Sequence, residues 1–229
     1  MADFYLVRTT TPTTADAVPL SALGTGTPDN TKFLRGDGAW ASPGAGGAHK
    51  STHQSGGNDA LTVMNANTGD VTANAADTYL TGSSLLIGGL IKAGTILRWR
   101  LVCTKTAAGT AAAAFNLRFG TNGTTGDSAR VTFTLSSATA ATDTGYFDIV
   151  CVVRAINAST GVVSAGMSAT HSTTGTTGLW SANEVFVAQS TSGNFDNTSS
   201  SLIAGVSCNP GASGVWTFQL VTAEAVNLA

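Results

Sequence analysis

Two histidines supply the spacing in this sequence that comes closest to a metal site. His49 and His53 stand four residues apart in HKSTH, and on a helix that spacing would place both imidazoles on one face, as in zinc proteases. Flanking glycines disfavour a helix, and Lys50 stands where a zinc protease needs its glutamate, so we expect no catalytic zinc. Two alternatives stay open: the side chains are exposed or packed on a stem, or copies of one histidine meet on a three-fold axis and hold a metal.

The other polar residues form no catalytic motif. No GxSxG sequence occurs, and the glycine-rich GTNGTTGDS lacks the lysine of a phosphate-binding loop. His171 lies in ATHSTTGTTG, where we expect it to be exposed in a loop. A polysaccharide hydrolase needs paired acidic residues; Asp143 and Asp148 are the nearest such pair, and we expect Asp148 on the polar face of a strand. We therefore predict no enzymatic activity, no catalytic residues, no assigned metal ligand and no cofactor.

Composition favours strands and turns over helices. Charged residues make up 10% of the 229 residues, where a typical globular chain carries about 25%. Threonine, which favours strands, and serine and glycine, which favour turns, take their place. The net charge is -2 and the basic residues are scattered, which gives no field that would attract nucleic acid. We expect an all-β protein that does not bind nucleic acid.

Cysteines and apolar runs bear on the compartment. Cys103, Cys151 and Cys208 are odd in number and lie in apolar, strand-like runs, so we expect buried, reduced thiols in a protein made in a reducing cytosol. No run of apolar residues reaches the length of about 18 that would span a bilayer. The N-terminus MADFYLVRTTTP lacks the features of a signal peptide, so we expect neither membrane insertion nor export by that route.

Residues 1–76 are predicted to form an extended arm. They contain four of the five prolines and many glycines, show no sustained periodicity, and cannot bury enough apolar surface alone to offset a chain entropy of about 1–2 kcal/mol per residue. They nevertheless carry Phe4, Phe33, Leu34 and Trp40, which are large for an inert linker. We expect this arm to become ordered against neighbouring copies or a larger scaffold, with aromatic side chains buried between three chains.

Residues 77–229 are predicted to form an antiparallel β-sandwich of the jelly-roll type. In TILRWRLVC, Leu97 and Trp99 alternate with Arg98 and Arg100, as in a half-buried strand. Short runs of this kind, separated by Gly, Ser, Thr, Asn and Asp, favour eight or nine strands in two sheets. The other predicted strands cover residues 84–90, 114–120, 129–135, 145–154, 161–170, 184–189, 201–208 and 215–221.

Two stretches of the arm resemble a known family. TKFLRGDGAWASP at residues 31–43 and HKSTHQSGGNDAL at residues 49–61 are similar to segments that recur in tail-fibre and related structural proteins of tailed bacteriophages. The resemblance implies a homotrimeric virion protein, assembled in the bacterial cytoplasm. Its N-terminal part would attach to other virion proteins and its C-terminal part would face outward.

We therefore expect a short tail fibre or spike that attaches to the host surface. Loops at residues 121–128, 171–182 and 190–200, with Trp180, would offer hydroxyls, amides and an aromatic ring to a surface glycan or protein. The alternative is a capsid decoration or cement protein that stabilises the shell or anchors head fibres. Both roles are structural, and both use the arm to bind the particle.

Overall fold

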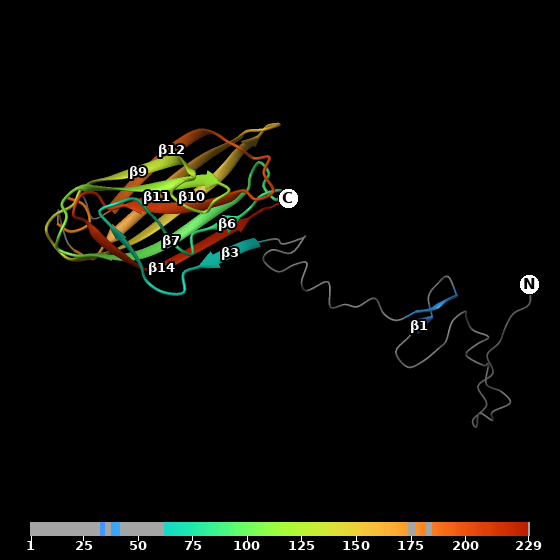
Figure 1. Ribbon diagram of the computed structural model, residues 1–229, viewed down its shortest axis with the longest axis horizontal. Helices are drawn as coiled ribbons and strands as arrows, with labels where there is room; N and C mark the ends of the chain where they lie inside the picture. The colour runs from blue at the N-terminus through green and yellow to red at the C-terminus, as the bar shows by residue number, and fades with distance from the viewer. Residues whose placement is uncertain (1–32, 35–37, 42–61, 174–176, 182–184, 229) are drawn as a thin grey trace, which may run out of the picture. The chain divides into compact units, whose positions relative to one another are not determined.

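The structure of the protein is a computed structural model, which describes five segments of the chain. None of these segments contains a helix (Figure 1). The chain divides into two units, residues 1–51 and residues 52–229. In the first unit, β1 (Phe33–Leu34) pairs antiparallel with β2 (Trp40–Ala41), and Gly38 in their connection has a φ of 77°, a conformation that glycine adopts without steric cost. The described segments are residues 33–34, 38–41, 62–173, 177–181 and 185–228.

The second unit is a sandwich of antiparallel strands. The strands are β3 (Thr62–Ala66), β4 (Val71–Asn74), β5 (Thr78–Tyr79), β6 (Leu85–Leu86), β7 (Ile96–Lys105), β8 (Ala112–Gly120), β9 (Ser128–Ser137), β10 (Asp143–Ile156), β11 (Gly161–His171), β12 (Val185–Phe195), β13 (Ile203–Asn209) and β14 (Val215–Val226). A seven-stranded sheet has the order β12-β11-β10-β7-β14-β3, with β4 also paired to β14. A five-stranded sheet has the order β5-β13-β8-β9, with β6 also paired to β13.

The strand order is that of a jelly roll. Six antiparallel pairings define this order: β3 and β4 with β14, β5 and β6 with β13, β7 with β10, and β8 with β9. The chain passes from one sheet to the other between these pairs, which folds one sheet over the other. The hairpin β11–β12 is added beside β10 and extends the large sheet. The predicted all-β sandwich of jelly-roll type is therefore confirmed.

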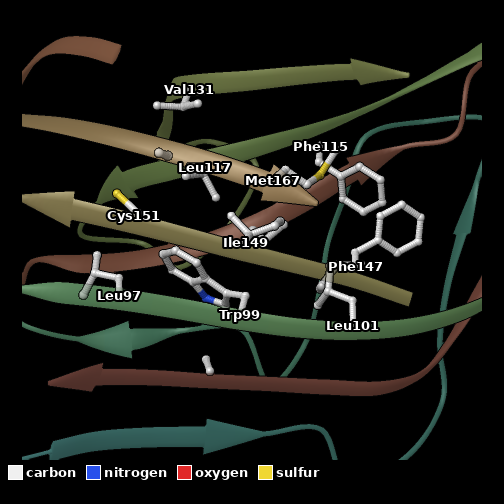
Figure 2. Close-up of a cluster of buried hydrophobic side chains, with 14 of the residues drawn as sticks. Leu97, Trp99, Leu101, Phe115, Leu117, Val131, Phe147, Ile149, Cys151 and Met167 are labelled. Atoms are coloured by element: carbon white, nitrogen blue, oxygen red, sulfur yellow. The ribbon is translucent and has the colours of Figure 1, made fainter. Parts of the chain in front are cut away.

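The core lies between the two sheets and follows the alternation of side chains along each strand. Leu97, Trp99 and Leu101 of β7 are fully buried, and they face side chains of the opposite sheet (Figure 2). Phe115 of the small sheet and Phe147 of the large sheet are in contact, with ring centroids 4.6 Å apart. Each buried side chain of this size contributes about 1.5–3 kcal/mol through the hydrophobic effect, so the inter-sheet layer stabilises the unit.

The three cysteines are part of this core. Cys103, Cys151 and Cys208 are buried and unpaired, which confirms the prediction of buried, reduced thiols. Burial raises the pKa of Cys151 to about 12 and raises those of the other two thiols as well. The thiols therefore stay protonated and act as small apolar side chains.

The sandwich begins earlier in the chain than the predicted boundary at residue 76. β3 and β4 both pair with β14, although each buries only one hydrophobic side chain, Val63 and Ala73 respectively. One buried residue gives no period in the sequence, and β14 supplies the hydrogen bonds that define these strands. The predicted strand at residues 84–90 is also shorter, because only Leu85–Leu86 is paired as β6.

We predict that Phe147→Ala destabilises the protein by about 3–5 kcal/mol, because it removes an aromatic ring from a closely packed core and leaves a cavity. The measurement is urea unfolding followed by tryptophan fluorescence. Leu86→Ala is the control, since Leu86 is 54% exposed and a surface truncation changes stability by about 0.5 kcal/mol or less. Equal losses in the two variants would contradict the assignment of Phe147 to the core.

Candidate functional site

The two ends of the sandwich carry different features. At one end, here called the proximal end, β3 starts with Thr62 opposite Val226, near the C-terminus (Figure 1). Strand β7 runs from Ile96, which also lies opposite Val226, to Lys105, which lies opposite Asp143 at the other end. The connections that follow β7, β9, β11 and β13 lie at that other end and are here called the distal cap. Other connections, among them residues 121–127 between β8 and β9, lie at the proximal end. The distal cap comprises residues 106–111, 138–142, 172–173, 177–181 and 210–214.

Asp143 organises the distal cap. Its side chain, at the start of β10, is 0% exposed, and its Oδ1 accepts hydrogen bonds from the Ser172 hydroxyl at 2.9 Å and from the Thr173 amide and hydroxyl at 3.0 and 2.7 Å. Its Oδ2 accepts from the Leu179 amide at 2.9 Å and lies 2.6 Å from Nδ1 of His171. One carboxylate therefore holds both ends of the described part of the segment that follows β11.

These donors control the ionisation of Asp143. Burial alone would raise the pKa of the carboxyl group, but the hydrogen bonds from Leu179, Thr173, Ser172 and His171 outweigh burial and lower the pKa from 3.8 to about 2. The carboxylate is therefore charged at neutral pH. Gly178 has a φ of 102°, and a Cβ there would lie 2.0 Å from Oδ2 of Asp143, so only glycine lets the backbone approach this closely.

Lys105 joins two further segments of the distal cap. The residue is fully buried, and its ammonium group donates to the carbonyl oxygens of Thr106 at 2.8 Å, Thr139 at 2.8 Å and Ala141 at 3.2 Å. Burial lowers the pKa of Lys105, and the charge of Asp143 opposes that shift. Thr139 in turn accepts a hydrogen bond from the Gly178 amide through its hydroxyl at 2.6 Å and donates its own amide to the Gly178 carbonyl at 3.0 Å. These bonds thus join the connections that follow β7, β9 and β11 into one hydrogen-bonded assembly.

His171 was predicted to be exposed in a loop, and that prediction is wrong. It is the last residue of β11, its side chain is 0% exposed, and its ring lies 4.4 Å from that of Trp180 between centroids. The alternation of β11, in which Val163 and Met167 point inward, places His171 on the same side. Nε2 is covered and has no hydrogen-bond partner among the described residues.

The described residues do not assemble a nucleophilic triad. An aspartate paired with a histidine is two thirds of such a triad, but the Ser172 hydroxyl donates to Asp143 and does not contact Nε2 of His171. The imidazole is also closed to solvent. Asp143 and Asp148 lie on opposite faces of β10, one buried and the other half-buried, so they cannot flank one glycosidic bond. The Asp143–His171 pair therefore serves to position the cap.

The surface of the distal cap is neutral. Its charged side chains, Lys105 below it and Asp143 within it, are buried, and no charged side chain is exposed in its described residues. Small and hydroxyl-bearing side chains provide the contact surface instead. The exposed residues of the cap are Thr106, Ala107, Ala108, Thr110, Ala140, Thr142, Ser172, Thr177, Ala212 and Ser213.

Two of the three predicted binding loops differ in the structure. Residues 121–127 do form a loop between β8 and β9. Trp180, however, is only 1% exposed and packs beside Phe147, so it cannot stack on a ligand. Residues 190–195 belong to β12, and only the residues that follow form a connection. The exposed binding surface predicted around Trp180 is therefore wrong.

Of the predicted arm residues, three fall in the described part. Phe33, Leu34 and Trp40 lie in the hairpin of β1 and β2, where Leu34 is opposite Trp40. Phe4 lies outside the described residues. The same is true of the histidine pair at positions 49 and 53, so its two alternatives stay open.

Comparisons with known proteins assign no family to the chain. No family model matches the sequence, and no curated protein matches it.

Within the described segments, no three His, Cys, Asp or Glu side chains gather as a metal site would require. No helix in that part of the chain is long and apolar enough to cross a membrane.

We predict that Asp143→Asn destabilises the protein by about 2–4 kcal/mol at pH 7, because buried donors lose their charged acceptor. The carboxyl pKa is about 2 in the folded chain and 3.8 as a free group, so the folded state binds fewer protons. Its stabilisation, on the order of 1–2 kcal/mol, is therefore complete above pH 4 and is lost as the pH falls towards 2.

The measurement is urea unfolding between pH 2 and 7. In Asp143→Asn we expect the difference in unfolding free energy from the native protein to shrink on acidification. Asp70→Asn is the control, because Asp70 is exposed between β3 and β4. A native protein whose stability stays constant from pH 5 to 2 would contradict the role given to the carboxylate.

Proposed function

We propose that the protein is a non-enzymatic structural protein of a tailed-bacteriophage particle, namely a short tail fibre or spike that attaches to the host surface through its distal cap. The observation that carries this proposal is the polarity of the sandwich. The chain joins the sandwich at the proximal end, where Thr62 pairs with Val226, and the hydrogen-bonded loops of the distal cap lie at the opposite end. A particle-bound arm would therefore leave the cap facing outward.

The arm supports the same function. Its stretch at residues 31–43 resembles recurrent fibre segments, and the hairpin of β1 and β2 lies within that stretch. Phe33 and Trp40 are on its two strands, and in this proposal these two residues would contact the particle or sister chains. A homotrimer would hold three arms at one attachment point.

The chemistry of the distal cap suits a neutral ligand rich in hydroxyl or amide groups. Exposed threonine and serine hydroxyls donate and accept hydrogen bonds, and the cap offers no exposed charge among its described residues. The buried contacts of Asp143 and Lys105 fix the loops before a ligand arrives, which lowers the entropic cost of binding. Three weak sites on one trimer would gain a factor of about 10²–10⁴ over a single site.

We predict that the purified full chain competes with phage particles for a susceptible host, and that Ala140→Lys lowers this competition at least about tenfold, since a long charged side chain disturbs a neutral surface. Residue 140 is exposed in the cap. The matched control is Ala129→Lys, because Ala129 is also exposed but lies near the proximal end of β9. Adsorption assays give the readout. Failure of the native chain to compete on any susceptible strain would contradict host attachment.

The location of the protein on the particle distinguishes a fibre from a capsid decoration protein. We predict that antibodies to the sandwich, carried on gold, label the tail in a few places per particle. Labelling spread over the whole head would contradict the fibre assignment and favour decoration, in which the same arm would bind shell subunits. Absence of label from purified particles would contradict both roles.

A further inference from the structure

The outer face of the large sheet carries most of the large exposed apolar side chains in the described part of the sandwich. Four large hydrophobic residues are exposed in the described part of the sandwich, and three of them lie on this face: Met64 on β3, Tyr146 on β10 and Leu220 on β14, exposed by 62%, 41% and 39%. The fourth, Leu86, is on the small sheet. Single exposed apolar side chains are ordinary, but a contiguous group marks a contact surface.

The strand register makes two of these side chains part of one band. Tyr146 lies opposite Val102 of β7, and Val102 lies opposite Leu220 of β14. The three residues thus occupy one level across three adjacent strands, with Val102 half-buried between the two more exposed side chains. Cross-strand neighbours of this kind are about 4.5–5.5 Å apart at Cβ, so the band is continuous.

The next level of the face carries two unpaired opposite charges. Arg100 of β7 lies opposite Asp148 of β10, yet neither side chain makes a hydrogen bond or an ion pair in the described part of the chain. Arg98 differs, since it pairs with Glu224 at 3.1 Å. A shallow pocket of about 180 Å³ beside the band is lined by Met64, Arg98, Arg100, Thr222, Ala223 and Glu224.

We propose that this outer face binds a second copy of the same chain. The face carries both signs of charge, with Arg98, Arg100 and Arg154 against Asp148 and Glu224. A sister face therefore offers both an apolar band and an opposite partner for Arg100 and for Asp148. Arg100 and Asp148 are at one level along the strands, as are Tyr146 and Leu220. A rotation about an axis parallel to the strands keeps each residue at its level and brings Arg100 of one copy beside Asp148 of the next.

This contact deepens the homotrimer in the proposed function but does not depend on what the distal cap binds. The face and the cap are separate surfaces, so each can fail without the other. If the chain blocks adsorption but the sandwiches of two copies make no contact, only the proposed contact between copies is overturned. If the sandwiches are in contact but the chain never competes for the host, only the attachment function is overturned.

The test places a photo-crosslinking amino acid, p-benzoylphenylalanine, at position 146 of the full chain and, as a matched control, at position 86. Both sites are exposed apolar positions, on the large and the small sheet respectively. We expect irradiation to join two chains several times more efficiently from position 146, with the crosslinked peptides mapping to β7, β10 or β14 of the second copy. Equal yields at both positions, or links only within one chain or only to residues 1–61, would overturn the proposal.

Charge reversal tests the predicted pairing in the same assay. Arg100→Asp alone and Asp148→Arg alone should each lower the intermolecular yield from position 146 several-fold, because like charges then meet across the contact. The double variant should restore the yield. Thermal unfolding of all three variants verifies that they are folded, and a folded double variant that stays as low as the single variants would overturn the pairing of these two residues across copies.

Discussion

The alternation of side chains along the long antiparallel strands determines both the core and the distal end of this molecule. Strands β7, β10 and β11 turn every second side chain inward over most of their length, and their inward positions at the distal end carry polar residues. Lys105 continues the inward series of β7, Asp143 that of β10 and His171 that of β11. A charged side chain at a buried position needs hydrogen-bond partners, and the connections between strands supply them.

Burial of two opposite charges explains how three connections of the distal cap are held in place. A buried carboxylate without donors would cost several kcal/mol, and Asp143 avoids that cost by accepting hydrogen bonds from the segment after β11. Lys105 meets the same requirement with backbone carbonyls of two neighbouring connections. The loops are therefore held by the chemistry of the strand ends, and their exposed side chains are free to be small and neutral.

The fold was predictable from the sequence where several inward residues repeat along one strand. β7 and β10 show the alternation over most of their length, so the sandwich and its core were predictable. β3 and β4 were not, because each buries one hydrophobic residue and is defined by pairing with β14. The burial of Trp180 depends on contacts with distant residues and left no local pattern. The inward position of His171, by contrast, could have been predicted by extending the alternation of β11 to its end.

The proximal end, the distal cap and the outer face of the large sheet together constrain the symmetry of any assembly that uses them. In the homotrimer that we propose, three arms would meet at one attachment point. This would bring the proximal ends together around a rotation axis parallel to the strands. A two-fold axis perpendicular to the strands would instead place proximal ends and distal caps on both sides. Under the parallel axis, the register that sets Arg100 level with Asp148 also keeps every cap at the same height. The side-to-side contact that we propose for the outer face is therefore the arrangement that presents several caps together to one surface.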